Sequence, residues 1–108
     1  MKHLIVGLLA VGALSAAQEK QTFTGVITDD MCATAGHASM RMGPTDAECT
    51  VACVIAHGAQ YVLRDGTTVY TLSDQQTPEK FAGQKVQVTG VLDGRTKTIQ
   101  VDSITAAQ

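Results

Sequence analysis

The sequence lacks several features that would assign a small protein to a common class. It has no tryptophan and no Cys-x-x-Cys motif, the pair that thiol oxidoreductases place at the start of a helix. Its longest apolar run, residues 4–14, has 11 residues, well short of the ~20 that a membrane-spanning helix needs. Its 8 basic residues are scattered among 10 acidic ones, so the basic patch of a nucleic-acid binder is also missing. We therefore expect no membrane anchor, no nucleic-acid partner and no thioredoxin-like activity.

The first 17 residues, MKHLIVGLLAVGALSAA, have the form of a secretory signal peptide. One lysine precedes the apolar run and small residues follow it, which predicts cleavage between Ala17 and Gln18. No cysteine follows the run, so a lipoprotein anchor is not expected. The sequence thus predicts a secreted or periplasmic protein, with a signal peptide at residues 1–17 and a single domain at residues 18–108. That domain has 91 residues and a net charge of −3, from 7 basic and 10 acidic side chains.

Segments rich in β-branched and aromatic residues predict a mainly β protein. Two Asp-Gly pairs, Asp65-Gly66 and Asp93-Gly94, each stand between two such segments and predict β-hairpins. In the second hairpin apolar residues alternate with polar ones, so four of them should share one buried face: Val86, Val88, Ile99 and Val101. The predicted first strand is residues 22–29, and the hairpins are residues 61–72 and 84–104.

Residues 46–57 predict an α-helix inserted after the first strand. The segment TDAE, beginning at Thr45, is a capping box, and Gly58 ends the helix. Apolar side chains run nearly all the way round this helix, so we expect most of it to be buried against the sheet. Cys49 and Cys53 lie one turn apart and face the same way, beside a narrow polar edge at the boundary between core and water.

A second, shorter helix is expected between the two hairpins, in the segment TPEKFAG. Thr77 is a suitable N-cap, Pro78 suits the first helical position and Gly83 ends the turn. We predict a single helical turn before the fourth strand, with Phe81 placed on the end of the sheet.

This order of elements resembles a small five-stranded oligonucleotide/oligosaccharide-binding (OB) barrel with a helical insert after its first strand. The segment FAGQKVQVTGVLDGRTKTIQVDSI is similar to the closing half of small exported bacterial OB-like proteins. The fuller pattern, MC, H, ECTVACV and GAQYVL, resembles a family of short secreted bacterial proteins of uncharacterised function, over about residues 22–104. The resemblance implies an OB-like fold and a candidate site with Cys-x4-His and Cys-x3-Cys spacing, and it implies no activity.

The three cysteines and one histidine form a candidate metal site. Their spacing is Cys32-x4-His37-x11-Cys49-x3-Cys53, and three thiolates with one imidazole are a recognised tetrahedral zinc set. Cys49 lies near the start of the predicted helix, where the helix dipole favours the thiolate form of a cysteine. The 11 residues between His37 and Cys49 are enough to fold back over the helical pair. We therefore predict that the four residues form one site.

A disulfide is the alternative, because small exported domains often use one as a staple. Cys49 and Cys53 are poorly placed to bond to each other, since Cβ atoms at i and i+4 lie ~5–6 Å apart and a disulfide needs roughly 4 Å. The disulfide would then join Cys32 to one of the two helical cysteines, and the other helical cysteine would stay unpaired. Metal and disulfide both stay open at this point.

Two methionines make copper(I) a second candidate ion. Met40 and Met42 flank Arg41 and would point the same way in an extended loop, and thioether, thiolate and imidazole together suit Cu(I). The segment HASMRM is similar to the His and Met-x-Met ligands of small periplasmic copper carriers with an OB barrel. Here, however, the pair lies in a loop and no tryptophan is present to cover the ion. The alternative is that the methionines fill a gap beneath the loop. His57 is a further candidate ligand, although its position favours contact with the last carbonyls of the helix.

Catalytic roles find little support. A cysteine could pair with His37 or His57 as nucleophile and base, but no third orienting group or oxyanion site is evident. The pair Asp29-Asp30 is interpreted as a strand-ending turn. We therefore predict a non-enzymatic exported module that holds zinc or copper through the Cys3His set. The alternative is a disulfide-stapled structural domain that binds an unknown protein partner.

Overall fold

The computed structural model describes residues 19–34, 36–39 and 41–107. The predicted signal peptide, its cleavage site and the candidate ligand Met40 lie outside the described residues. Within the described ranges, no helix is both long enough and apolar enough to cross a bilayer.

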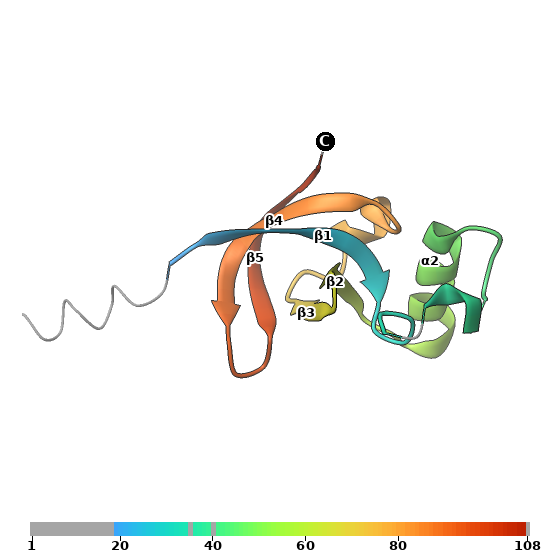
Figure 1. Ribbon diagram of the computed structural model, residues 1–108. Helices are drawn as coiled ribbons and strands as arrows, with labels where there is room; N and C mark the ends of the chain where they lie inside the picture. The colour runs from blue at the N-terminus through green and yellow to red at the C-terminus, as the bar shows by residue number, and fades with distance from the viewer. Residues whose placement is uncertain (1–18, 35, 40, 108) are drawn as a thin grey trace, which may run out of the picture.

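In the described part of the chain, five strands form one closed ring, with one α-helix, α2, beside it (Figure 1). The order around the ring is β1-β2-β3-β5-β4, and pairing of β4 with β1 closes it. Only β3 and β5 run parallel to each other; the other neighbours are antiparallel. The prediction of a mainly β protein with one inserted helix is confirmed. In chain order, with η for a 3-10 helix, the elements are β1 (Gln21–Asp29), η2 (His37–Ser39), α2 (Asp46–His57), β2 (Tyr61–Asp65), β3 (Thr68–Leu72), η3 (Thr77–Phe81), β4 (Lys85–Asp93) and β5 (Thr98–Ala106).

The inside of the ring is a core to which every strand contributes. The alternation of apolar and polar residues along each strand turns one set of side chains inward. Val101 packs against this core, and its three predicted partners are fully buried in it, as expected from their spacing. The buried core consists of Ile27, Tyr61, Leu63, Leu72, Val86, Val88 and Ile99.

Both predicted hairpins form, but the second turn differs in detail. Asp65 pairs with Thr68, which leaves the two-residue loop expected after an Asp-Gly signal. In the second hairpin Asp93 pairs with Thr98, so the loop spans residues 94–97. Its left-handed residue is Lys97, with φ of 56°, and not the glycine of the Asp-Gly pair. The pair therefore marked the turn correctly but not its length.

The short helix before β4 is capped from outside the predicted segment. The N-cap is Gln76, whose side chain makes no capping hydrogen bond, so the prediction of Thr77 as the N-cap is wrong. The amides of Gln76 and Thr77 donate instead to Asp74 Oδ1, at 2.9 and 3.0 Å. Phe81 packs against the core, as predicted. Gly83, with φ of 76°, follows the helix, and a Cβ at this position would lie 3.1 Å from the amide nitrogen of Ala47. The absence of a side chain there lets the start of β4 approach the first turn of α2.

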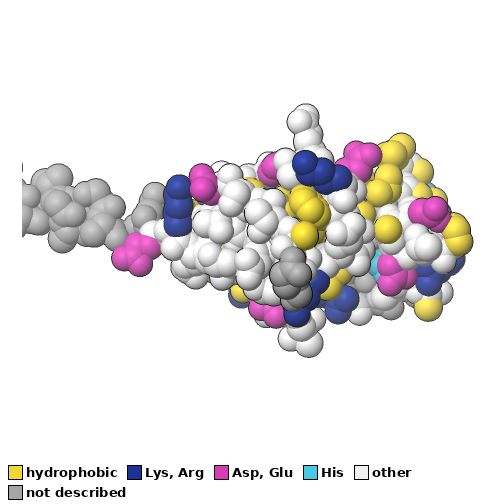
Figure 2. Space-filling view, turned by 90° about the horizontal axis from the view of Figure 1, so that it is seen from above, with side chains coloured by type: hydrophobic (Ala, Val, Ile, Leu, Met, Phe, Trp, Pro, Cys, Tyr) yellow, Lys and Arg dark blue, Asp and Glu magenta, His cyan; other side chains and the backbone are white. Residues whose placement is uncertain are grey.

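Helix α2 has its predicted ends but a different orientation. The amide of Glu48 donates to Thr45 Oγ1 at 3.1 Å, and Gly58 takes the left-handed conformation with φ of 70°. The cysteine side of the helix is fully buried, whereas Ile55 is 73% exposed. The predictions of a mostly buried helix and of cysteines at the water boundary are therefore wrong. Hydrophobic side chains gather on the surface at the end of the molecule that carries α2 (Figure 2).

The ring itself explains this orientation. Its interior is filled by side chains of its own strands, so it has no room for a whole helix. Helix α2 instead packs beside the end of β1 and supplies one face to a second, smaller core of Cys32, Cys49, Cys53 and Ala59. Val54 is partly buried against both cores and joins them. The thiols thus stand where helix, loop and sheet meet.

Candidate metal centre

The loop after β1 begins with a carboxylate that holds the first cysteine in place. Asp29 Oδ2 accepts the amides of Met31 and Cys32, both at 3.1 Å. These bonds form a turn of the kind that aspartate makes with the backbone two or three residues on. The Asp29 side chain is 0% exposed, and its other oxygen, Oδ1, has no hydrogen-bond partner.

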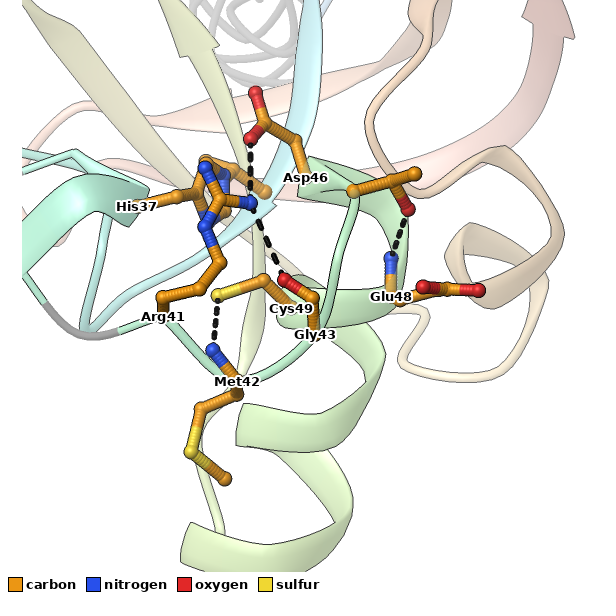
Figure 3. A network of polar contacts seen from close by, with 9 residues as sticks. His37, Arg41, Met42, Gly43, Asp46, Glu48 and Cys49 are labelled. Carbon is orange, nitrogen blue, oxygen red and sulfur yellow. Dashed lines mark hydrogen bonds and ion pairs between the residues drawn. The ribbon is translucent and has the colours of Figure 1, made fainter.

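Helix α2 contributes the other two thiols. Cys49 and Cys53 are one helical turn apart on the buried face, and both are fully buried. The backbone amide of Met42 donates to Cys49 Sγ at 3.3 Å (Figure 3). Arg41 ties the same loop to the helix start through an ion pair with Asp46 of 3.2 Å. The loop therefore lies against the helix and encloses Cys49.

His37 is the first residue of the short helix η2. It lies on the same side of α2 as Cys49 (Figure 3). Its Nε2 is 3.4 Å from Thr28 Oγ1, a residue near the end of β1. Its other ring nitrogen, Nδ1, is buried and has no hydrogen-bond partner. Metal-binding histidines usually hold a polar group with the nitrogen that does not bind the metal. The contact with Thr28 leaves Nδ1 of His37 available for such a role.

The candidate ligands converge in two overlapping groups. One group is Cys32, His37 and Cys49; the other is Asp29, Cys32 and Cys53. Within each group the ligand atoms lie within 4.8 Å of one another. Together, the four predicted residues lie close enough to hold a metal ion, although they are distant in sequence.

Asp29 was not predicted as a site residue, because Asp29-Asp30 reads as an ordinary turn signal. It does make that turn, and one of its carboxylate oxygens also lies within 4.8 Å of the sulfur atoms of Cys32 and Cys53. The available sequence signal was a carboxylate at the end of a strand, three residues before a cysteine. Only the packing of α2 against this strand end makes the carboxylate part of the site.

Met42 and His57 are the additional candidates that lie in the described part of the chain. Met42 contacts the cysteine core and its backbone reaches Cys49, but its side chain extends away from that sulfur (Figure 3). This agrees with the gap-filling alternative. His57 is exposed at the end of α2 and belongs to neither group of candidate ligands among the described residues. Its position is that of the helix-end alternative.

No disulfide joins the three cysteines, all of which lie in the described part of the chain. The pKa of the Cys32 thiol is raised to about 12, first by burial, then by the Asp29 carboxylate and then by the other two thiols. Burial and the same carboxylate also raise the pKa of Cys53. Deprotonation would place several negative charges together away from water, and a bound cation removes that penalty.

A hollow of about 410 Å³ connects the site with solvent. Cys32 and His37 form part of its wall, and the side chains of Arg41 and Arg64 lie at its margin. Both arginines are exposed, and Arg41 is already paired with Asp46. An ion could therefore reach the thiols from this side.

Comparison with known proteins places the chain in a family through its second half. A family model described as protein of unknown function (DUF5818) matches residues 53–107, which comprise Cys53, the end of α2 and strands β2 to β5. Cys32, His37 and Cys49 precede the matched region. No curated protein and no solved structure matches the chain. By this match over half of its length, the chain belongs to the DUF5818 family of proteins of unknown function.

Proposed function

We propose that this protein is an exported, non-enzymatic binding module that holds a soft metal ion, zinc or copper(I), through Cys32, His37, Cys49 and Cys53. The observation that carries the proposal is the convergence of three buried thiols and one imidazole from a loop and a helix. Soft thiolate and imidazole ligands select zinc and copper(I) over calcium or magnesium.

The separations of the ligand atoms are close to those of a loaded site. Tetrahedral zinc with three sulfur ligands and one nitrogen ligand holds these atoms roughly 3.5–3.8 Å apart. Here the ligand atoms lie within 4.8 Å of one another in each group of three, so binding an ion in either group requires a contraction of about 1 Å. His37 would bind through Nδ1 and donate Nε2–H to Thr28 Oγ1. The amide of Met42 would stabilise the thiolate of Cys49 by its hydrogen bond to sulfur.

The same proposal includes an OB-like fold and export of the protein from the cytoplasm. The ring order and the short helix before β4 support an OB-like barrel with α2 as an insert. The form of residues 1–17 supports export, with a mature protein that begins at Gln18. N-terminal sequencing of the secreted protein should find Gln18 first, and retention of Met1 would contradict export.

Mass measurement of the mature protein tests the metal. After the reduced protein is loaded with zinc, its native mass should exceed the apoprotein mass by the mass of the bound zinc. After denaturation and alkylation, three modified thiols should be found. His37→Ala should weaken zinc binding at least tenfold, and His57→Ala, on the exposed end of α2, should leave it unchanged.

Two results would contradict the proposal. One is a native mass without metal at zinc or copper(I) concentrations that saturate ordinary thiolate sites. The other is a purified protein with a single alkylated thiol, because a bridge from Cys32 to a helical cysteine would then be the native state. The second result would establish the disulfide-stapled alternative instead.

A further inference from the structure

A fully buried carboxylate lies beside the thiols, and no side chain in the described part of the chain forms a salt bridge with it. Asp29 is 0% exposed, and Oδ1 has no hydrogen-bond partner. Of the salt bridges between described residues, Lys20–Asp102 and Arg41–Asp46, neither involves this carboxylate. Buried charges in proteins are normally paired or bound to metals. The described residues supply no cationic partner for Asp29, and a bound metal ion would provide one.

The two groups of candidate ligands share a single atom, Cys32 Sγ. His37 and Cys49 stand with it in one group, and Asp29 and Cys53 stand with it in the other. One residue of each group also has a buried polar atom without a hydrogen-bond partner: His37, at Nδ1, in the first and Asp29, at Oδ1, in the second. A single tetrahedral ion takes four ligands, so it would leave one of the five candidates unused.

When all three thiols and the carboxylate bind as anions, charge favours two ions over one. Three thiolates and one carboxylate carry four negative charges, and the imidazole is neutral when it binds a metal. One zinc ion would leave two negative charges in a buried site, which is costly. Two zinc ions would leave none, whereas two copper(I) ions would leave two. Neutrality thus favours a pair of divalent soft ions.

We propose that the site holds two zinc ions bridged by the Cys32 thiolate, one bound by His37 and Cys49 and the other by Asp29 and Cys53. This inference rests on the proposed function, because it assigns the number and kind of ions in the same site. Each zinc has three protein ligands and one position left for water or a small ligand. With Zn–S bonds of about 2.3 Å on a shared sulfur, the ions lie at most ~4.6 Å apart, which includes the usual range for two-metal sites.

The test counts ions in matched variants of the reduced mature protein. Native mass spectrometry after zinc loading and buffer exchange should find two zinc ions in the wild type. Asp29→Asn removes the charge but keeps an oxygen that can accept the amides of Met31 and Cys32, and it should bind one. Asp30→Asn is the control, since Asp30 is exposed and belongs to neither group; it should bind two.

Cadmium provides a second readout, and on the wild type it depends on no variant. Wild-type protein loaded with ¹¹³Cd should give two ¹¹³Cd resonances. Cys53→Ser, where it folds, should give one. A wild type that saturates with one ion, or Asp29→Asn that still binds two, overturns the two-ion site and leaves the proposed function intact. A wild type that binds no ion overturns both.

Discussion

At the scale of single residues, Gly90 shows how closely the strands of the ring approach each other. The ladder between β4 and β5 shifts register between Thr89 and Gly90. A Cβ on Gly90 would overlap the carbonyl oxygen of Gln100 and lie 2.9 Å from Ile99 Cγ2. The first obstacle is backbone, so it cannot rotate away as a side chain does. Only glycine fits at this point of the ring.

Gly90→Ala should therefore destabilise the protein by about 1–3 kcal/mol, the usual range for overpacking. Gly94→Ala is the matched control, because no heavy atom lies within 4 Å of its added Cβ. That control should stay within about 0.5 kcal/mol of the wild type. Urea unfolding at equal metal content measures both, and equal midpoints for the two variants would contradict the close approach of β4 and β5.

At the scale of elements, the setting of α2 predicts opposite effects at adjacent positions. Ile55 is 73% exposed, so Ile55→Ser should change the free energy of unfolding by no more than about 0.5 kcal/mol. Val54 is partly buried against both cores, so Val54→Ala should cost about 1–2 kcal/mol. Thermal unfolding of both variants checks this. A large loss of stability in Ile55→Ser would mean that a partner covers this face of α2 in solution.

The short helix η3 predicts a dependence of stability on pH. Hydrogen bonds from the Thr77 side chain and backbone, followed by the Gln76 amide, lower the pKa of Asp74 below its usual value of 3.8. The folded state therefore binds the proton less readily than the unfolded state. The stabilisation is present above the unfolded pKa and is lost as pH falls through the folded pKa.

The comparison with Asp74→Asn isolates this contribution. At each pH, the difference in unfolding free energy between wild type and variant cancels the titration of all other groups. It should be greatest above about pH 5 and decline toward pH 2. Solvent screens this partly exposed carboxylate, so we expect a change below about 1 kcal/mol. A difference that stays constant over this range would rule out the lowered pKa.

At the scale of the whole molecule, the metal site joins the β1 end, the following loop and α2. Ions that bind only the folded state should stabilise it by about 2.7 kcal/mol at a free concentration of 100 Kd. For a domain of this size, that corresponds to a rise in Tm of roughly 10–20 °C. A chelator should reverse the rise, and His37→Ala should reduce it. A fall in Tm on addition of a reductant, but not of a chelator, would indicate the disulfide-stapled alternative instead.

Short-range signals in the sequence determined the elements. Thr45 caps α2 through an amide three residues away, and Asp65-Gly66 turns a chain whose strands are adjacent. Alternation placed Val86 and Val88 on the inner face without knowledge of the rest of the chain. Each of these depends on contacts within a few residues, which a local pattern can encode. The Cys and His spacing likewise predicted one shared cluster, because a loop of that length can return to the helix.

The tertiary structure decided what each element faces. The apolar circumference of α2 does not specify which side is buried, and the filled interior of the ring left only the cysteine side to be covered. The role of Asp29 has the same origin, since a turn-forming carboxylate becomes a buried ligand candidate only when a helix packs over it. The capping of η3 by Asp74 was also invisible to a pattern that began at Thr77. Burial depends on surfaces brought together from distant segments, so it is a property of the assembled fold and not of a local stretch of sequence.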